Sequence, residues 1–507
     1  MGQNIRSQIV TWSYGPLLVA LVIYLLTSLV VFRYYQHQIN PDGVVYISVA
    51  KSYLCDNWIQ AIDSYHSPLL SWLLVPFLFF DSTPTVALFF TKILSVIVGF
   101  FTIIGFWFLY SRFGLNKNLK TVLTVVMVPL TIYFAFSVIT PDLLMVCSLI
   151  YYLYFLFSPE YSNKIFNGIF CGLFAALAYL SKSFALPFFL IHFFLINALY
   201  YFNDPSRREN TVKNLLLGIL VFFLISGVWI GLISDKEGQF TYGTAGKFNH
   251  DLVGPNSKGW GLPQVGGEFF EVESWSPFES WTNFMHQLQI IYSNLIQIFS
   301  ILEYFSYFSI LILLSYIILC IRPLKELIKL PKILIPLLTI IIFCGGYTPV
   351  LVEERYLWLV WVLLLLMGGS LIEGLFNKNC FNQYQKGIII LIFSISFLMA
   401  PLTYMDTYKN SGEDIYQIQK SINLPRVYGR SASNGILDKS LYLSYYLGTN
   451  YAGQAGSKGN YAGLENQLIN SNVDLYFLWD DEAELNLENY TEIGKGEFKD
   501  VKIYSRI

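Results

Sequence analysis

The sequence predicts an all-α polytopic membrane protein with about eleven membrane-spanning helices, within a range of about ten to thirteen, and a small C-terminal α/β domain outside the cytoplasm. Three observations support this prediction. The 507 residues are 55% hydrophobic but only 13% charged, too little charge to cover a soluble globule of that size. Aromatic residues make up 18% of the chain, and many Tyr and Trp flank apolar runs, where their rings suit the headgroup region. After residue 404 the sequence becomes polar.

Apolar runs long enough to cross about 30 Å of hydrocarbon recur before residue 404. The first follows a short polar start and is not followed by a small-residue cleavage site, so we expect a retained anchor. The predicted spans are 14–33, 84–111, 120–138, 141–157, 165–181, 184–202, 213–234, 299–321, 333–350, 355–372 and 387–404.

Lysine and arginine in the short loops set the expected orientation. The apolar segment 67–80 is shorter than the ~20 residues of a spanning helix, and treating it as interfacial or re-entrant places the basic loops on the inner face. With a cytoplasmic N-terminus, the loops 34–83 and 235–298 face outward. We therefore expect a membrane core over 1–404 and an extracytoplasmic domain over 405–507 in a bacterial plasma membrane.

The C-terminal segment mixes two periodicities. Residues 413–422 and 462–470 have helical spacing, whereas 473–479 and 501–507 are typical of strands. This mixture predicts a small α/β domain, in which we find no catalytic constellation. The net charge of −2 and the absence of a long basic tract argue against nucleic acid as a partner and leave the lipid bilayer as the expected one.

Two acids lie at the predicted outer ends of helices. Asp42, in Asn40-Pro41-Asp42, follows the first span, where Asn can cap a helix and the helix dipole favours negative charge. Asp142 opens the fourth span, where an ionisable group is costly unless it faces water or a partner. Helix capping would account for both acids, so the residues themselves leave capping and catalysis open.

Two cations are expected on the same membrane face. Lys182 lies in the outer turn between two spans, and Arg355 follows Glu353 and Glu354 at another outer helix end. Arginine suits a phosphate because it donates two parallel hydrogen bonds. Snorkelling of Lys182, and neutralisation of Arg355 by its neighbouring glutamates, are the alternatives.

Polar and aromatic residues complete this outer surface. Tyr46 follows Asp42 on a helix expected to lie along the membrane, and His66 precedes Ser-Pro, where a turn residue is the plain alternative. Tyr242 and Asn249 belong to the loop 238–267, which is rich in Gly and aromatic residues. Such a loop permits tight turns and sugar-stacking surfaces, although a plain mobile loop has the same composition.

In combination, these motifs resemble those of the GT-C superfamily of lipid-phosphate-sugar-dependent glycosyltransferases. The similarity is to the bacterial branch related to protein O-mannosyltransferase and the lipid A aminoarabinose transferase, and covers roughly residues 10–405. Gly43 stands where many relatives have a second acid, and His66-Ser67-Pro68 replaces a double proline. The matching motifs are Pro41-Asp42-Gly43, His66-Ser67-Pro68-Leu69 with Trp72, Thr140-Pro141-Asp142, Tyr179-Leu180-Ser181-Lys182 and Glu354-Arg355-Tyr356.

The resemblance implies a hexosyl- or pentosyltransferase. It would move a sugar from a polyprenyl-phosphate carrier to an envelope glycan, lipid or protein on the outer face, with inversion at the anomeric carbon. The implied roles are Asp42 as the base, Asp142, His66 and Tyr46 in the acceptor cavity, Lys182 and Arg355 at the carrier phosphate, and Glu353, Glu354, Tyr242 and Asn249 in support. Some relatives bind a divalent metal ion, for which Asp42, Asp142 and His66 are the candidate ligands here.

Two other classes of protein share parts of this pattern. A secondary transporter or lipid flippase would show internal symmetry and broken helices near the midplane, whereas here the polar groups gather at one face. A catalytically inactive scaffold with a partner-binding tail would tolerate Asp42→Asn. The one-sided placement of the polar groups favours the enzyme.

Overall fold

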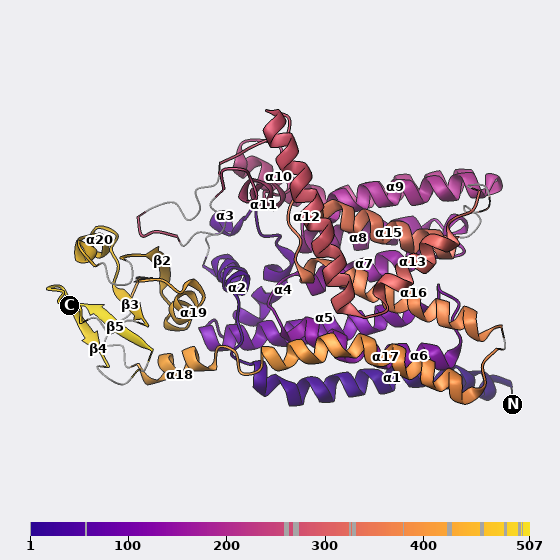
Figure 1. Cartoon of the computed structure of the whole chain (residues 1–507), viewed down its shortest axis with the longest axis horizontal. Helices are drawn as coiled ribbons and strands as arrows, with labels where there is room; N and C mark the ends of the chain where they lie inside the picture. The colour runs from indigo at the N-terminus through magenta and orange to yellow at the C-terminus, as the bar shows by residue number, and fades with distance from the viewer. Residues whose placement is uncertain are drawn as a thin grey trace.

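The computed structural model describes residues 2–55, 58–257, 263–266, 273–323, 326, 331–378, 380–422, 428–456, 461–480, 484–494, 498 and 500–507. Parts of the loops 34–83, 235–298 and 238–267 and of the segment 405–507 therefore lie outside the described residues. Within the described part, a bundle of apolar helices forms most of the molecule, and a small sheet lies beyond one end of it (Figure 1).

The membrane core consists of long helices and several short ones. In chain order they are α1 (Gly2–Tyr35), α2 (Pro41–Leu54), α3 (Trp58–Ala61), α4 (Leu69–Leu78), α5 (Pro84–Tyr110), α6 (Lys117–Phe136), α7 (Asp142–Leu156), η1 (Tyr161–Asn163), α8 (Phe166–Ser181), α9 (Ala185–Asn203), η2 (Pro205–Arg207), α10 (Arg208–Glu237), α11 (Ala245–Leu252), α12 (Trp281–Phe305), α13 (Ser309–Leu319), α15 (Pro331–Tyr347), η3 (Glu354–Leu357), α16 (Trp358–Phe376) and α17 (Gln383–Thr407).

The helices confirm the multi-pass membrane class. Seven described helices are long and apolar enough to cross a membrane, and the bent pair α12 and α13 would make an eighth. Three further predicted spans are the apolar helices α7, α8 and α15, with 15, 16 and 17 residues, fewer than the ~20 of a usual span. Every predicted span thus coincides with apolar helix, while the total of eleven crossings stays a prediction.

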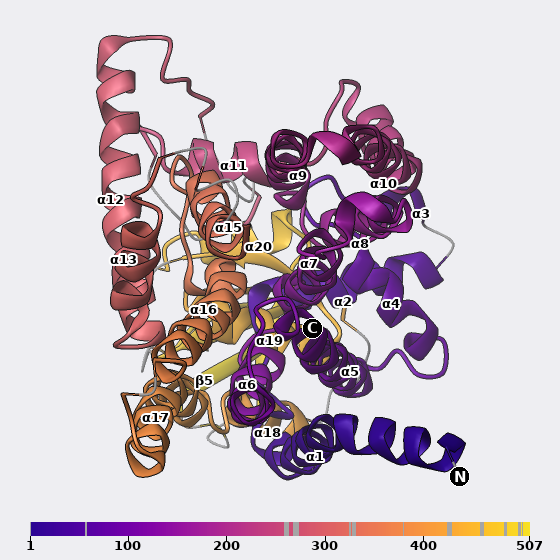
Figure 2. The same cartoon turned by 90° about the vertical axis from the view of Figure 1, so that its right-hand side faces the viewer.

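The predicted span over 299–321 is sharply bent near its start. Helix α12 ends at Phe305, α13 begins at Ser309, and their axes differ by 110°. Ser306 has an extended φ of −167°, and its hydroxyl accepts the N–H of Phe308 at 3.2 Å and bonds Ser396 Oγ at 2.7 Å. These hydrogen bonds replace the helical ladder at the bend. Figure 2 shows α12 along one side of the bundle.

The short apolar segment 67–80 does not form a spanning helix. It contains α4, a helix of 10 residues, which packs against α2. Ser71 Oγ of α4 donates to the carbonyl of Tyr46 at 2.9 Å. The pair α2 and α4 therefore forms a rigid support for the residues that follow the first span.

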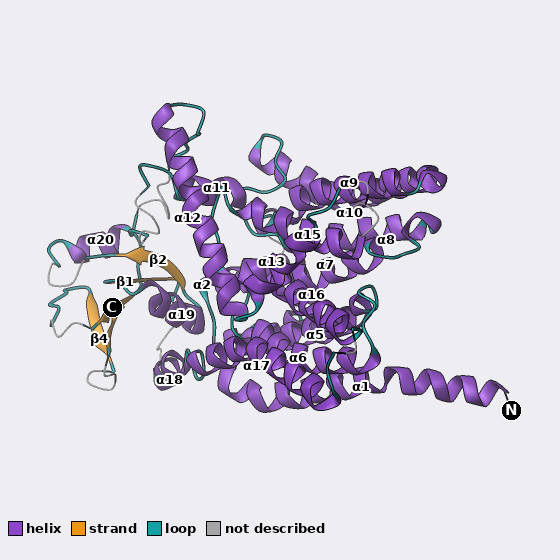
Figure 3. Ribbon diagram, turned by 45° about the vertical axis from the view of Figure 1, so that its right-hand side comes forward, coloured by secondary structure: helices purple, strands orange, loops and turns teal. Residues whose placement is uncertain are grey.

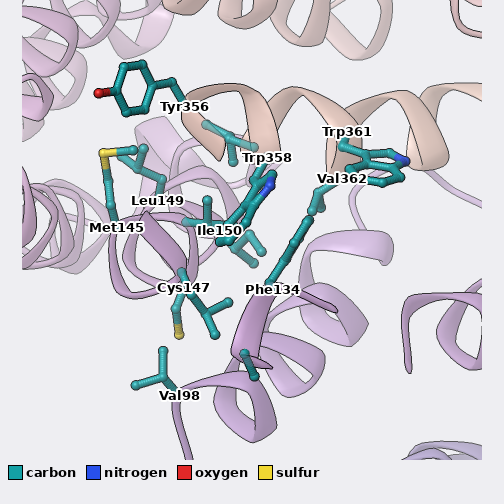
Figure 4. Packing of buried hydrophobic residues seen from close by; sticks show 14 of the residues in the cluster. Val98, Phe134, Met145, Cys147, Leu149, Ile150, Tyr356, Trp358, Trp361 and Val362 are labelled. Atoms are coloured by element: carbon teal, nitrogen blue, oxygen red, sulfur yellow. The ribbon is translucent and has the colours of Figure 1, made fainter. Parts of the chain in front are cut away.

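Helix α16 lies in the centre of the core, and every residue from Trp358 to Met367 is buried. Trp358 stacks on Phe134 of α6 with ring centroids 4.2 Å apart, and Trp361 stacks on Phe305 of α12 at 4.2 Å. Figure 4 shows Trp358 beside residues of α6 and α7. Since these large rings fix the start of α16, they also fix η3, the turn before it that contains Arg355.

Helices α8 and α10 approach each other through glycine. A Cβ atom added to Gly172 would lie 2.2 Å from the carbonyl oxygen of Gly218, and one added to Gly168 would lie 2.3 Å from that of Asn214. Small residues permit such backbone contact between membrane helices. The first half of α8 is thereby held close to α10.

The C-terminal sheet has the strand order β2-β1-β3-β5-β4, with β1 parallel to β2 and β3 and the other pairs antiparallel. The predicted helices and strands at 413–422, 462–470, 473–479 and 501–507 are confirmed, which bears out the small C-terminal α/β fold. The described elements are α18 (Glu413–Ser421), β1 (Arg430–Ser433), α19 (Leu437–Leu447), β2 (Asn450–Gln454), α20 (Leu464–Asn470), β3 (Leu475–Trp479), β4 (Tyr490–Ile493) and β5 (Val501–Arg506).

The sheet lies at the end of the bundle where α2 is found, away from the N-terminus (Figures 1 and 3). Helix α19 packs on α2 and α5, and Tyr445 Oη donates to the carbonyl of Pro84 at 2.6 Å. At the edge of β2, Gln454 N–H donates to Pro263 O at 2.6 Å and Gln454 O accepts from Val265 N–H at 2.8 Å. The sheet is therefore joined to both predicted outer loops.

Candidate active site

Arg355 lies among three carboxylates at this end of the bundle. Its Nη1 donates to Asp42 Oδ2 at 2.6 Å and its Nε to Glu353 Oε2 at 2.6 Å, while Asp142 Oδ2 lies 3.9 Å from Nε. Asp142 is buried, with 2% of its side chain exposed, but Asp42 is 36% exposed. The structure thus brings the two predicted acids to one guanidinium, and Asp42 is the more exposed of the two.

Lys182 completes this cluster from the turn between α8 and α9. Its Nζ donates to Asp142 Oδ1 at 2.6 Å and lies 3.5 Å from the centre of the Tyr356 ring. Burial lowers the pKa of the Lys182 ammonium below its ordinary value, and the Asp142 carboxylate opposes that shift. Asp142 therefore orients both cations, since it contacts Lys182 and Arg355 together.

The positions of the acids follow from two helix starts. Asp42 and Asp142 lie in the first turns of α2 and α7, where the positive end of the helix dipole favours a carboxylate. The expected side-chain cap from Asn40 is not made. Asn40 Oδ1 instead accepts the backbone N–H of Ile139 at 2.7 Å. This bond joins the loop before α2 to the loop before α7, and so brings the two acids together.

Tyr46 lies one turn after Asp42, and His66 lies beside Tyr46 but pairs with Asp63. Tyr46 is buried one turn after Asp42, and its ring meets that of His66 edge-on with centroids 5.1 Å apart. His66 Nδ1 bonds Asp63 Oδ2 at 2.7 Å. Burial, together with the charges of Asp42 and Asp142, raises the pKa of Tyr46 well above its ordinary value. The phenol of Tyr46 therefore stays protonated and neutral.

The loop that carries Tyr242 and Asn249 is hydrogen-bonded to Tyr65 and Tyr179. Asn249 Oδ1 accepts from Tyr65 Oη at 3.4 Å, a long hydrogen bond. Burial and the Asp42 charge raise the pKa of Tyr65 to about 12. Tyr242 contributes its backbone carbonyl, which accepts from Tyr179 Oη at 2.9 Å, and none of its described side-chain contacts reaches the charged cluster.

A cavity of about 360 Å³ opens beside Asp42, on the side of Glu353 and Glu354. Glu354 does not contact Arg355: its two carboxylate oxygens accept from Tyr133 Oη at 2.8 Å and from Trp358 Nε1 at 2.9 Å. The cavity is lined by Asn40, Pro41, Asp42, Tyr133, Ser137, Val138, Glu353, Glu354, Arg355, Trp358, Tyr404 and Tyr408. It therefore combines acids, one guanidinium and several aromatic rings.

The metal-ligand hypothesis gains no support from the geometry. Within the described ranges, no three His, Cys, Asp or Glu side chains are grouped so that they could hold a metal ion. Asp42 and Asp142 are engaged by Arg355 and Lys182, and His66 by Asp63. We therefore derive no step through a metal.

Sequence reasoning missed several residues of this site. Asp63 is the partner of His66, the Tyr356 ring lies under Lys182, and Tyr133, Tyr404 and Tyr408 line the cavity. Asp63 stands three residues before His66, a spacing that a turn can close, and could have been found. The tyrosines give no such signal, because aromatic residues are common throughout this chain.

The described helices define a polytopic membrane protein, and comparison with solved structures shows the GT-C-like fold that the motifs predicted. Solved structures that resemble it include ArnT from Cupriavidus metallidurans bound to undecaprenyl phosphate, with a TM-score of 0.54 and 12% identity over 96% of this chain and 98% of that one. Another is the Archaeoglobus fulgidus oligosaccharyltransferase tethered with an acceptor peptide, with a TM-score of 0.51 and 10% identity over 92% and 69%. At identities this low, the TM-scores show a shared fold and carry no further conclusion about this chain. No protein-family model and no curated protein matches the sequence.

Proposed function

We propose that this chain is a glycosyltransferase that moves a sugar from a polyprenyl-phosphate carrier to an envelope glycan, lipid or protein on the outer face of a bacterial membrane. The observation that carries the proposal is the cluster of Asp42, Asp142, Lys182 and Arg355 at one end of an apolar bundle. A half-exposed carboxylate beside two cations supplies a base and a phosphate clamp within one site. The GT-C fold and the lipid phosphate bound to ArnT agree with this reading.

The base and the two cations of this cluster supply the groups that the transfer reaction needs. The acceptor hydroxyl gives its proton to Asp42 while its oxygen attacks the anomeric carbon of the donor. The bond between that carbon and the phosphate oxygen breaks, and the electron pair leaves with the polyprenyl phosphate. One displacement of this kind inverts the anomeric centre. Lys182 and Arg355 offset the charge that develops on the leaving phosphate.

Arg355 couples donor binding to the base in this proposal. Without a donor, the guanidinium donates to Asp42 at 2.6 Å, which holds the carboxylate in place and occupies one of its oxygens. A donor phosphate presents two oxygens, to which the planar guanidinium can donate two parallel hydrogen bonds. When Arg355 turns to the phosphate, Asp42 is released and can accept the acceptor proton.

The aromatic cavity is the proposed place of the transferred sugar. Its wall carries the parallel rings of Tyr133 and Tyr404, with centroids 5.2 Å apart, followed by Tyr408. Aromatic faces suit the C–H faces of a sugar ring, and the acids Glu353 and Glu354 accept hydrogen bonds from its hydroxyls. We place the acceptor on the opposite side of Asp42, near Tyr65, His66 and Asn249.

A transfer assay tests the proposal. Purified wild type and Asp42→Asn are incubated in liposomes with a panel of radiolabelled polyprenyl-phosphate sugars and an envelope extract as acceptor. The matched control is Asp81→Asn, because Asp81 lies on the same outer loop but its carboxylate accepts from its neighbour Thr83. We expect transfer by wild type and by the control, and none by Asp42→Asn.

Two results would contradict the proposal. Equal transfer by wild type and Asp42→Asn would remove Asp42 as the base. The absence of transfer by wild type across the donor panel would favour the transporter or scaffold, and flipping of a labelled lipid in the same liposomes would separate these two.

A further inference from the structure

One buried cation of the membrane core takes no part in the proposed chemistry. Lys92 belongs to α5, and none of its surface is exposed. Its ammonium donates to Gln38 Oε1 and to the backbone carbonyl of Phe136 at 3.2 Å. In the described ranges, no carboxylate forms an ion pair with Lys92. The ammonium of Lys92 is thus hydrogen-bonded to an amide side chain and to the C-terminal end of α6.

Such a residue is costly to keep. Moving an ammonium from water into a hydrocarbon layer without an acid to pair it is unfavourable by several kcal/mol. A leucine or methionine would fill the same space on α5 without that cost. The hydrogen bonds that Lys92 makes therefore indicate its role in the structure.

Both hydrogen bonds of Lys92 reach or adjoin the segments that precede the two acids of the site. We call these segments, residues 36–40 and 137–141, the two junctions. Gln38 lies in the junction between α1 and α2, four residues before Asp42. Phe136 is the last residue of α6, and the junction after it leads to Asp142. Gln38 Nε2 donates to the carbonyl of Ser137 at 2.6 Å, so that Lys92 and Gln38 together close a bridge between the two junctions.

The next residues continue the bridge toward the acids. Asn40 Oδ1 accepts the N–H of Ile139 at 2.7 Å, and a Cβ atom added to Gly43 would lie 2.8 Å from that of Ile139. Gly43 therefore lets α2 lie directly on the second junction. From Lys92 outward, each contact fixes the place of Asp42 relative to Asp142, and hence their common position around Arg355.

We infer that Lys92 is a positioning residue that sets the separation of Asp42 and Asp142 by joining the two junctions through Gln38. The catalytic half of this inference rests on the proposed function; the structural half does not. A shift of about 1 Å in a reacting group costs on the order of 10²-fold in rate. Loss of the bridge should therefore lower kcat and leave donor affinity nearly unchanged, because Lys182 and Arg355 remain.

The core also supplies a matched control. Tyr152 Oη bonds His192 Nδ1 at 2.8 Å, and His192 Nε2 bonds Thr339 Oγ1 at 2.9 Å. His192 and Thr339 have no exposed surface, and the chain joins α7, α9 and α15 rather than the two junctions. Thr339→Val removes one hydroxyl from a network buried as deeply as that of Lys92.

The test compares wild type, Lys92→Met, Gln38→Met, the double variant and Thr339→Val. Hydrogen exchange by mass spectrometry follows peptides that contain residues 36–43 and 137–143, and steady-state transfer gives kcat and KM for the donor. We expect faster exchange in both junctions and a kcat about 10²-fold lower in either single variant, with KM within about twofold. The double variant should be no worse than the poorer single one, because both act through one bridge.

Thr339→Val should lower the melting temperature and leave exchange in the junctions and kcat as in wild type. Unchanged junction exchange in both Lys92→Met and Gln38→Met would overturn the bridge. Faster exchange with wild-type kcat, or additive losses in the double variant, would overturn the positioning role. An inactive wild type would contradict the proposed function and with it the catalytic half, while exchange would still decide whether Lys92 joins the junctions.

Discussion

Arg355 Nη1 lies 2.6 Å from Asp42 Oδ2, although the two residues are 313 positions apart in the sequence. The same guanidinium contacts Glu353 and Asp142. Three carboxylates therefore share one arginine and Lys182, which leaves one carboxylate without a cation of its own. Asp42 and Glu353 are far more exposed than Asp142, so these two acids, rather than Asp142, can exchange their partner when an anion enters.

The first prediction concerns the guanidinium of Arg355. Arg355→Lys keeps the positive charge but loses the planar fork, so the phosphate and Asp42 can no longer be contacted in turn by one rigid group. We expect transfer measured as kcat/KM to fall roughly 10²- to 10³-fold. Arg112→Lys is the control, because Arg112 donates to the carbonyl of Tyr154 at the other end of α7. Similar losses in both variants would contradict a phosphate role for Arg355.

The second prediction concerns the aromatic wall of the cavity. Tyr408→Ala removes a ring that lines the space beside Asp42, and we expect KM for the sugar donor to rise about tenfold, equivalent to about 1.4 kcal/mol. Tyr384→Ala changes an exposed tyrosine at the opposite end of the same helix and should leave KM unchanged. A normal donor KM in Tyr408→Ala would place the sugar elsewhere.

The third prediction concerns the glycine contact between α8 and α10. A methyl group on Gly172 would meet the carbonyl of Gly218 at 2.2 Å, so the helices must separate. Gly172→Ala should lower the free energy of unfolding by about 1 to 3 kcal/mol. Gly231→Ala on α10 meets no atom within 4 Å and should be neutral or slightly stabilising. Thermal unfolding in detergent measures both, and equal midpoints would contradict the close contact.

The fourth prediction concerns pH and Asp63. Burial favours the neutral acid, but hydrogen bonds from the His66 side chain and from the N–H groups of Tyr65 and His66 outweigh it and hold the pKa of Asp63 below its ordinary 3.8. The unfolded chain therefore binds more protons in this window, so stability contributed by Asp63 is present above 3.8 and is lost as the pH falls through the folded pKa.

Asp63→Asn should accordingly melt below wild type near neutral pH and match it in strong acid. The measurement is the melting temperature of both proteins from roughly pH 7 to pH 1. His66→Phe should lower the melting temperature by part of the same amount, because it removes one of the donors to Asp63. A difference that does not depend on pH would show that the charge of Asp63 is not what stabilises this turn.

Much of the fold could be predicted because lipid imposes long apolar runs that are visible in sequence. The bend between Phe305 and Ser309 was missed because it depends on Ser306 meeting Ser396, a contact that local periodicity does not encode. In the C-terminal domain β1 and β2 were missed as well. Both are short strands that gain their burial from neighbouring strands rather than from a pattern of their own.

The charged residues of the site could be found for a related reason. Asp42, Asp142, Lys182 and Arg355 could be found because each lies at the end of an apolar run and the predicted orientation placed all four on one face. Their pairing could not be predicted, since each contact joins segments far apart in sequence. Lys92 was overlooked because it lies inside an apolar run, where one charge does not disturb the helical pattern.

The edge contact between Gln454 and Pro263 also has a consequence for the order of biosynthesis. The neighbouring residues Gln264 and Gln454, whose side chains also bond, are 190 positions apart, so Pro263 and Gln264 leave the ribosome long before their partner strand exists. Their contacts with β2 can form only after β2 has been translated. In the proposed orientation, with both segments outside, this contact is a late event, and a protease added outside the membrane should cleave near Gln264 in ribosome-stalled chains that end before residue 450 more readily than in finished ones.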